Sequence, residues 1–302
     1  LRPYQFCNLT EVVVRGTDNK LGLKEKIRFA TILGTFQSTL TDFKYLRKIW
    51  KDNTEDERLL GVSLTGIMDN RLTSNPDKGL LSELKQVAID TNKEFAKQLK
   101  INQSTAITCV KPSGTVSQLV DSASGIHTRH SPYYIRTVRC DTKDPLTTFM
   151  IEKGFPNEPD VTNPSAVTVF SFPIKSPDRA ICRNDVGAIQ QLETWLMYQK
   201  YWCEHKPSVT ISVKDHEWMD VGAWVYKNFD HVAGISFLPY SDHVYQQAPY
   251  QDCDKKQYDE LLKIMPKGVD FAAFKEDQDN TTGSQELACT GGVCELVDVS
   301  AN

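Results

Sequence analysis

The sequence contains no run of about 20 apolar residues, which is the length that a membrane-spanning helix needs. Cysteine is also scarce, because eight in 302 residues is far below the density of a disulfide scaffold. Basic residues do not dominate, since 35 Lys and Arg are balanced by 39 Asp and Glu, for a net charge of −4. This balance disfavours a broad nucleic-acid-binding surface. We therefore expect a soluble, cytoplasmic protein with reduced thiols that binds neither membranes nor nucleic acid.

The first seven residues lack a starting Met, a basic segment and an apolar segment, so they do not resemble a signal peptide. The sequence opens on Leu1 and soon enters a predicted strand. We expect it to be the C-terminal part of a longer protein. Its hydrophobic fraction of 40% and charged fraction of 25% are typical of a globular chain.

Short β-rich segments alternate with amphipathic helical segments along most of the chain. The predicted strands are 6–15, 61–68, 106–110, 133–139, 166–174, 208–213 and 232–238, and the predicted helices are 23–40, 81–99, 186–202 and 216–229, with a short helix from 115. This alternation indicates an α/β fold with mainly parallel strand pairing. The polar, Gly-containing segment 275–302 is predicted to be a flexible tail on a domain formed by residues 1–274.

A turn between the strand ending at 110 and the helix starting at 115 consists of Pro112, Ser113, Gly114, Thr115 and Val116. Such a turn leaves unpaired backbone N–H groups at a helix start, where the helix dipole also attracts anions. Gly114 allows a ligand to approach the backbone closely, and the two hydroxyls are donors. A phosphate-binding turn is one interpretation. An ordinary turn is the other, and residue types alone favour it.

Two thiols near the end of the sequence, Cys289 and Cys294, flank a Gly-Gly pair within the polar tail. An accessible dithiol is suited to thiol–disulfide exchange. Half of a zinc site is an alternative, although no second Cys or His pair lies nearby, and two thiols without a role are a third. Cys7, in a β-rich segment, is by residue type alone a small buried hydrophobe. The histidines lack partners at ligand spacing, so no metal site is predicted.

Several strings complete the pattern. Residues 6–12 are FCNLTEV, 61–69 are GVSLTGIMD, 110–116 are VKPSGTV, 124–127 are SGIH, 236–239 are SFLP, 247–249 are QAP and 289–294 are CTGGVC. Together, and in this order, they resemble the adenosylcobalamin-dependent (class II) ribonucleotide reductases over nearly the whole chain.

The resemblance implies the C-terminal part of a ten-stranded α/β barrel that reduces ribonucleoside di- or triphosphates by a radical mechanism. It implies that the turn from Pro112 to Val116 holds the substrate phosphates. Cys7 would be one of two thiols that reduce the ribose and become a disulfide. Cys289 and Cys294 would re-reduce that disulfide and pass the oxidation to thioredoxin or a similar dithiol donor. Adenosylcobalamin would be bound mainly by residues outside this chain.

One departure from the family pattern is the absence of its Asn-Pro-Cys-Gly-Glu finger-loop motif, which supplies the thiyl cysteine and a catalytic Glu. We expect this motif, and the disulfide partner of Cys7, in a missing N-terminal part of the reductase. An intein junction, a split gene or a partial gene would each explain such a boundary. The alternative functions are a non-catalytic redox or zinc-binding module built around the Cys tail, and another phosphate-binding α/β enzyme.

Overall fold

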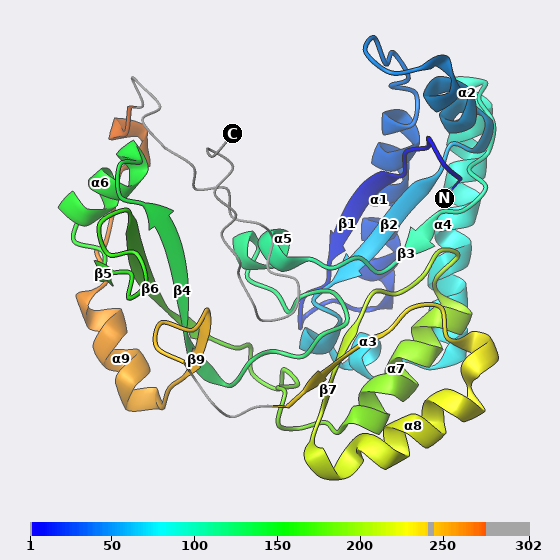
Figure 1. Cartoon of the computed structure of the whole chain (residues 1–302). Coiled ribbons are helices and arrows are strands. Elements are labelled where there is room, and N and C mark those ends of the chain that lie inside the picture. Colours follow the sequence, from blue (N-terminus) through cyan, green and yellow to red (C-terminus); the bar gives the residue numbers. More distant parts are fainter. Residues whose placement is uncertain (1, 241–244, 276–302) are drawn as a thin grey trace. The chain divides into compact units, whose positions relative to one another are not determined.

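The computed structural model describes residues 2–240 and 245–275 (Figure 1). They form two compact units, the first from the described parts of Leu1–Arg129 and Pro177–Tyr240, the second from those of His130–Ser176 and Ser241–Asn302. The division lies within the region that we expected to be one domain. The predicted boundary after residue 274 adjoins the undescribed residues and stays a prediction.

Parallel strands form the centre of the first unit. The sheet β1-β2-β3 consists of β1 (Asn8–Val13), β2 (Leu60–Thr65) and β3 (Thr108–Cys109), and β7 (Thr210–Val213) pairs in parallel with β8 (Ser236–Pro239). An isolated parallel bridge between Val110 and Pro207 connects the end of β3 to the approach to β7. Five strands therefore follow one another in parallel, which agrees with the α/β expectation.

Helices connect and cover these strands. The longest are α1 (Lys20–Gln37), α4 (Lys78–Leu99) and α7 (Ala188–Tyr201), and the shorter ones are α2 (Lys48–Glu57), α3 (Arg71–Ser74), α5 (Gly114–Leu119) and α8 (Trp218–Lys227). The Asn19 side chain accepts from Gly22 N and caps α1. α1 packs on β1, β2 and α4, and all six residues of β2 are buried.

The end of β3 is fixed by hydrogen bonds from the helix that packs behind it. Trp202, next to α7, is fully buried and its indole Nε1 donates to the carbonyl of Cys109 at 2.8 Å. The hydroxyl of Thr108 donates in turn to the carbonyl of Trp202 at 2.5 Å. Both polar groups are thereby satisfied in the core, and the strand that leads into the turn at residues 112–116 has one defined position.

The second unit contains an antiparallel sheet, so the prediction of mainly parallel pairing is wrong for this part of the chain. Its order is β5 (Asn157–Pro159), β6 (Val167–Lys175), β4 (Tyr133–Asp141) and β9 (Tyr250–Asp252), with α6 (Pro145–Glu152) and α9 (Lys255–Ile264) alongside. Only three of the nine residues of β4 are buried and the strand carries two arginines, whereas β2 is buried throughout. One solvated face is typical of antiparallel sheets, and burial on both faces of parallel ones.

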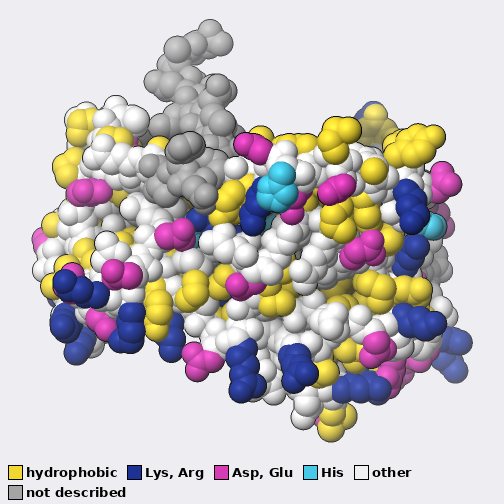
Figure 2. Space-filling model, turned by 90° about the horizontal axis from the view of Figure 1, so that it is seen from below, with side chains coloured by type: hydrophobic (Ala, Val, Ile, Leu, Met, Phe, Trp, Pro, Cys, Tyr) yellow, Lys and Arg dark blue, Asp and Glu magenta, His cyan; other side chains and the backbone are white. Residues whose placement is uncertain are grey.

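The surface carries charges of both signs. On the face displayed in Figure 2, Lys and Arg side chains are interspersed with Asp and Glu side chains. Within the described residues, every helix is too short or too polar to cross a lipid bilayer.

Candidate active site

One face of the sheet β1-β2-β3 gathers polar and thiol side chains from three strands. Side chains alternate along a strand, so Cys7, which immediately precedes β1, shares a face with Leu9 and Glu11. The register places Leu9 opposite Gly61 and Glu11 opposite Ser63 on the neighbouring β2. This face brings the sequence-predicted Cys7 into the same region as residues that sequence reasoning did not select.

Two thiols flank the bare backbone of Gly61. A Cβ atom at Gly61 would lie 3.1 Å from Cys7 Sγ, 3.4 Å from Cys109 Sγ and only 2.3 Å from a methyl carbon of Leu9. Glycine therefore leaves the space into which these side chains point. Cys7 is half-buried, and burial raises the pKa of its thiol. Cys109 is fully buried, which raises the pKa of its thiol to about 12, so it is a poor source of thiolate.

Cys109 is not placed to form a disulfide with Cys7, although both thiols border Gly61. β2 separates β1 from β3, and two strand spacings amount to roughly 9.6 Å, beyond the ~7 Å limit for the Cα atoms of a disulfide. All six described cysteines are free thiols. The partner that the resemblance assigns to Cys7 is therefore not Cys109.

Glu11 lies further along the same face and connects all three strands. Its carboxylate accepts from the hydroxyl of Ser113 at 2.7 Å and, at 3.5 Å, from that of Ser63. The Ser63 hydroxyl in turn accepts from the backbone N–H of Lys111 at 3.0 Å. Burial raises the pKa of Glu11, and the hydrogen bonds from the two serines oppose that shift. Sequence reasoning missed Glu11, yet the period-2 alternation from Cys7 would have placed it on this face.

The predicted phosphate-binding turn follows β3 and leads into α5. Ser113 is 3% exposed, whereas Pro112, Gly114, Thr115 and Val116 are exposed. Among the described residues, no acceptor receives the backbone N–H groups of 114–116. A Cβ atom on Gly114 would meet no described residue within 4 Å, so the described part of the chain leaves the space beside this backbone open. These features permit anion binding, and the assignment of all five residues as phosphate ligands stays a prediction.

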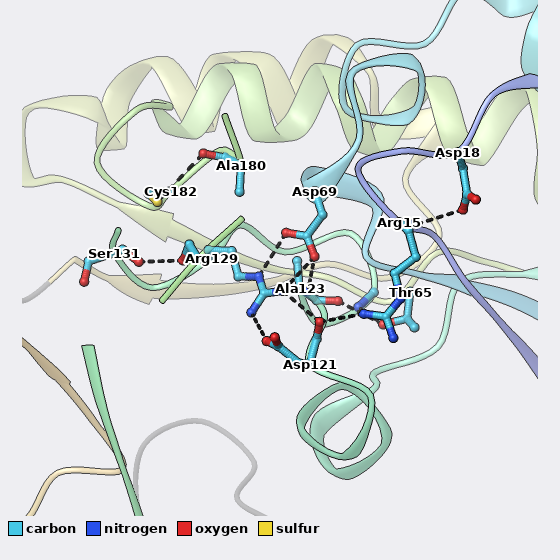
Figure 3. Close-up of polar contacts among 12 residues, drawn as sticks. Arg15, Asp18, Thr65, Asp69, Asp121, Ala123, Arg129, Ser131, Ala180 and Cys182 are labelled. Carbon is cyan, nitrogen blue, oxygen red and sulfur yellow. Dashed lines mark hydrogen bonds and ion pairs between the residues drawn. The ribbon is translucent and has the colours of Figure 1, made fainter. Parts of the chain in front are cut away.

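A buried ion pair supports the loop that follows α5 (Figure 3). Arg129, 3% exposed, donates through Nε and Nη2 to the two carboxylate oxygens of Asp69, each at 2.9 Å. Its Nη1 donates to Asp121 Oδ1 at 2.9 Å, and the backbone N–H of Ala123 donates to Asp69 Oδ2 at 2.8 Å. The loop from 121 to 129 is thereby attached to the segment just after β2.

The string SGIH lies within this loop and contacts the base of the turn. Gly125 has φ +55°, and a Cβ there would lie 2.9 Å from the carbonyl oxygen of Lys111. His127 shares a hydrogen bond between Nδ1 and the Ser124 carbonyl, and its Nε2 accepts from Thr210 N. A ring nitrogen that accepts an N–H carries no proton, so the imidazole is neutral, and burial lowers its pKa. These contacts give the loop a defined position next to Lys111, at the start of the turn.

Cys289 and Cys294 lie outside the described residues, and their redox role stays a prediction. Within the described part of the chain, no three His, Cys, Asp or Glu side chains are grouped as metal ligands.

The comparisons with known proteins point to one enzyme family. The chain is 27% identical to the curated adenosylcobalamin-dependent ribonucleoside-triphosphate reductase of Lactobacillus gasseri, over 96% of this chain and 43% of the relative. It is 26% identical to the enzyme of the same name from Euglena gracilis, over 89% of this chain and 40% of the relative. No family model matches the sequence.

A crystal structure of a B12-dependent (class II) ribonucleotide reductase matches 88% of this chain and 41% of that chain, with a TM-score of 0.76 and 24% identity. The chain thus has the fold of part of a class II reductase, and the predicted fold class is confirmed. The resemblance seen in the sequence strings is confirmed by curated relatives along nearly the whole chain. The chain spans less than half the length of those relatives.

Proposed function

We propose that this chain supplies the substrate-phosphate turn and one reducing cysteine of an adenosylcobalamin-dependent ribonucleoside-triphosphate reductase. One observation carries the proposal. Cys7 and Glu11 share a face of β1, and Glu11 accepts the hydroxyl of Ser113 at 2.7 Å, so the thiol and the turn belong to one site. The triphosphate is chosen over the diphosphate because the curated relatives are named triphosphate reductases.

The role of Cys7 in the reduction follows from atom balance. A ribonucleotide loses its 2′-hydroxyl as water when two thiols each supply one hydrogen and join as a disulfide. One thiol is Cys7, which is half-buried beside Gly61. The second thiol is the one that the family resemblance places in the missing N-terminal part of the reductase, and Cys109, two strands away, is not this partner. The finger-loop cysteine that starts the radical chemistry is also proposed to lie outside it.

The turn binds the phosphates through its backbone. The backbone N–H groups of residues 114–116 have no acceptor among the described residues, and Thr115, which carries a hydroxyl donor, is exposed. Hydrogen bonds between N–H donors and phosphate oxygens are charge-assisted and therefore stronger than neutral ones. The loop from 121 to 129 supports the turn, since Gly125 lies close to the carbonyl oxygen of Lys111, the residue before Pro112.

Adenosylcobalamin, when bound, supplies the radical that ordinary side chains cannot generate. We propose that the cofactor is held mainly by residues outside this chain, and no step is assigned through it.

The tail completes the cycle in this proposal. Cys289 and Cys294 reduce the disulfide formed by Cys7 and become a disulfide themselves, which thioredoxin or a similar dithiol then reduces. The alternative, a zinc-binding or non-catalytic redox module, involves the same two cysteines. Zinc bound in a one-to-one ratio to the purified chain would favour that alternative.

Two matched serine variants test the proposal. Cys7→Ser and Cys109→Ser remove thiols on either side of Gly61, and only Cys7 is assigned a chemical role. In a complete reductase that carries these residues, formation of deoxynucleotide is measured with adenosylcobalamin and dithiothreitol. Cys7→Ser is expected to abolish multiple turnovers, and Cys109→Ser to retain them. Sustained turnover by Cys7→Ser would refute the role of this cysteine.

A further inference from the structure

Ser113 is the residue of the turn whose side chain is least available to a ligand. It is 3% exposed, and its hydroxyl is 2.7 Å from Glu11 Oε2. A serine hydroxyl has a single hydrogen to donate, and an ionised carboxylate can only accept. The hydrogen of Ser113 is therefore committed to Glu11, and a phosphate oxygen at the turn would find no donor in this side chain.

The remaining contacts of Glu11 show why the chain keeps a carboxylate there. Ser63, 2% exposed, uses its hydroxyl to receive the N–H of Lys111 at 3.0 Å and lies 3.5 Å from Glu11 Oε1. Lys111 and Ser113 are the residues on either side of Pro112. The Glu11 carboxylate is thus connected directly to Ser113, after Pro112. It is connected to Lys111, before Pro112, through the hydroxyl of Ser63.

We propose that Glu11 is the positioning residue of the phosphate-binding turn, with Ser113 as its anchor rather than as a phosphate donor. The ligand is then held by the backbone N–H groups of 114–116 and the hydroxyl of Thr115. This inference rests on the proposed phosphate turn and adds a residue to it. It also explains why an acidic side chain stands near an anion site: its charge strengthens the hydrogen bond that fixes the turn.

A pair of neutral variants separates positioning from charge. Glu11→Gln and Glu11→Ala both remove the carboxylate charge, but only Gln keeps an oxygen that accepts the Ser113 hydroxyl. Ser113→Ala removes the anchor from the other side. Thr10→Val serves as the control on β1, because the buried Thr10 hydroxyl has no hydrogen-bond partner among the described residues and its side chain lies beside Gly34 of α1.

The full 302-residue chain is titrated with inorganic tripolyphosphate, and the amide shifts of residues 114–116 give the dissociation constant. Circular dichroism confirms that each variant is folded. We expect Glu11→Ala to bind about tenfold more weakly than Glu11→Gln, and Ser113→Ala about tenfold more weakly than the unmodified chain. Thr10→Val is expected to bind like the unmodified chain.

Equal affinities for Glu11→Ala and Glu11→Gln, or an unchanged affinity for Ser113→Ala, would overturn the positioning role while leaving the phosphate turn intact. If tripolyphosphate shifts no amide of 114–116 in the unmodified chain, the phosphate turn itself is overturned, and the positioning role with it.

Discussion

Replacing Arg129 with methionine removes the cation of a buried pair while keeping most of the side-chain length. Asp69 is left with its side chain 3% exposed, and its remaining hydrogen bond comes from the backbone N–H of Ala123. Breaking a buried ion pair from one side costs ~3–5 kcal/mol, because the other charge stays buried without compensation. We expect Arg129→Met to lower the free energy of unfolding by this amount.

Asp121 provides the matched comparison, because it contacts the same arginine from the surface. Its side chain is 66% exposed, so solvent screens the attraction, and exposed pairs contribute about 0–1 kcal/mol. Asp121→Asn is therefore expected to cost less than about 1 kcal/mol. The backbone oxygen of Asp121, which also accepts from Arg129, is unchanged by this substitution.

Urea unfolding of the 302-residue chain, followed by tryptophan fluorescence, gives both costs, since the buried Trp195 and Trp202 report on the first unit. Asp69→Asn in the Arg129→Met background should recover part of the loss, because it removes the unpaired charge. A cost below about 1 kcal/mol for Arg129→Met, or equal costs for the two single variants, would refute the assignment of a buried, desolvated pair.

Three further outcomes follow from the same structure and sequence. In a complete reductase, Cys289→Ser or Cys294→Ser should abolish turnover with thioredoxin and retain it with dithiothreitol, a dithiol small enough to reach the active-site disulfide directly; normal turnover with thioredoxin would contradict the relay. The 302-residue chain alone, which does not contain Asn-Pro-Cys-Gly-Glu, should form no deoxynucleotide with adenosylcobalamin and dithiothreitol, and any product would contradict the account. Burial lowers the pKa of His127, so its neutral form stabilises the fold above the unfolded pKa of about 6.5, and this contribution is lost as the pH falls below that value. The urea midpoint should therefore fall between about pH 7 and about pH 5, and less steeply in His127→Gln; identical slopes would show that His127 does not contribute.

The elements that sequence patterns predicted well are those with a strong period and a clear boundary. α1 (Lys20–Gln37) and α4 (Lys78–Leu99) overlap the predicted helices 23–40 and 81–99, and each begins three residues earlier than predicted. β2 overlaps the predicted strand 61–68 and is buried along its whole length, whereas Ile67 and Met68, at the end of that prediction, lie in a 3-10 helix. Local periodicity alone determines such elements, because burial on one face or on both leaves a direct record in residue type.

The direction of strand pairing was harder to predict from the sequence. The sequences of both units show the same alternation of strand-like and helical segments, yet the sheet of the first unit is parallel and that of the second is antiparallel. Pairing direction depends on the path of the chain between strands, which residue type does not record. The available signal was Arg136 and Arg139 within β4, because charged side chains are unfavourable in a strand that is buried on both faces, as the strands of parallel sheets are.

The residues of the candidate site were also predicted only in part from the sequence. Cys7 and the turn were selected from sequence strings, whereas Glu11 and Gly61 were not. Their roles depend on register, since Gly61 lies between two thiols and Glu11 reaches Ser113, 102 positions along the chain. A contact between residues so far apart is set by the sheet and not by local pattern.

The most direct test of the central claim compares two glycines in a complete reductase that carries this chain. A Cβ atom at Gly114, in the turn, or at Gly222, in α8, would meet none of the residues that the structure describes within 4 Å, so both Gly114→Ala and Gly222→Ala should fold. The added methyl group at 114 occupies the space assigned to the phosphate. Loss of one charge-assisted hydrogen bond costs ~1.5–3 kcal/mol, so Gly114→Ala should raise KM for the ribonucleoside triphosphate about tenfold to hundredfold, with Gly222→Ala unchanged. Unchanged KM and kcat for a folded Gly114→Ala enzyme would contradict the phosphate turn.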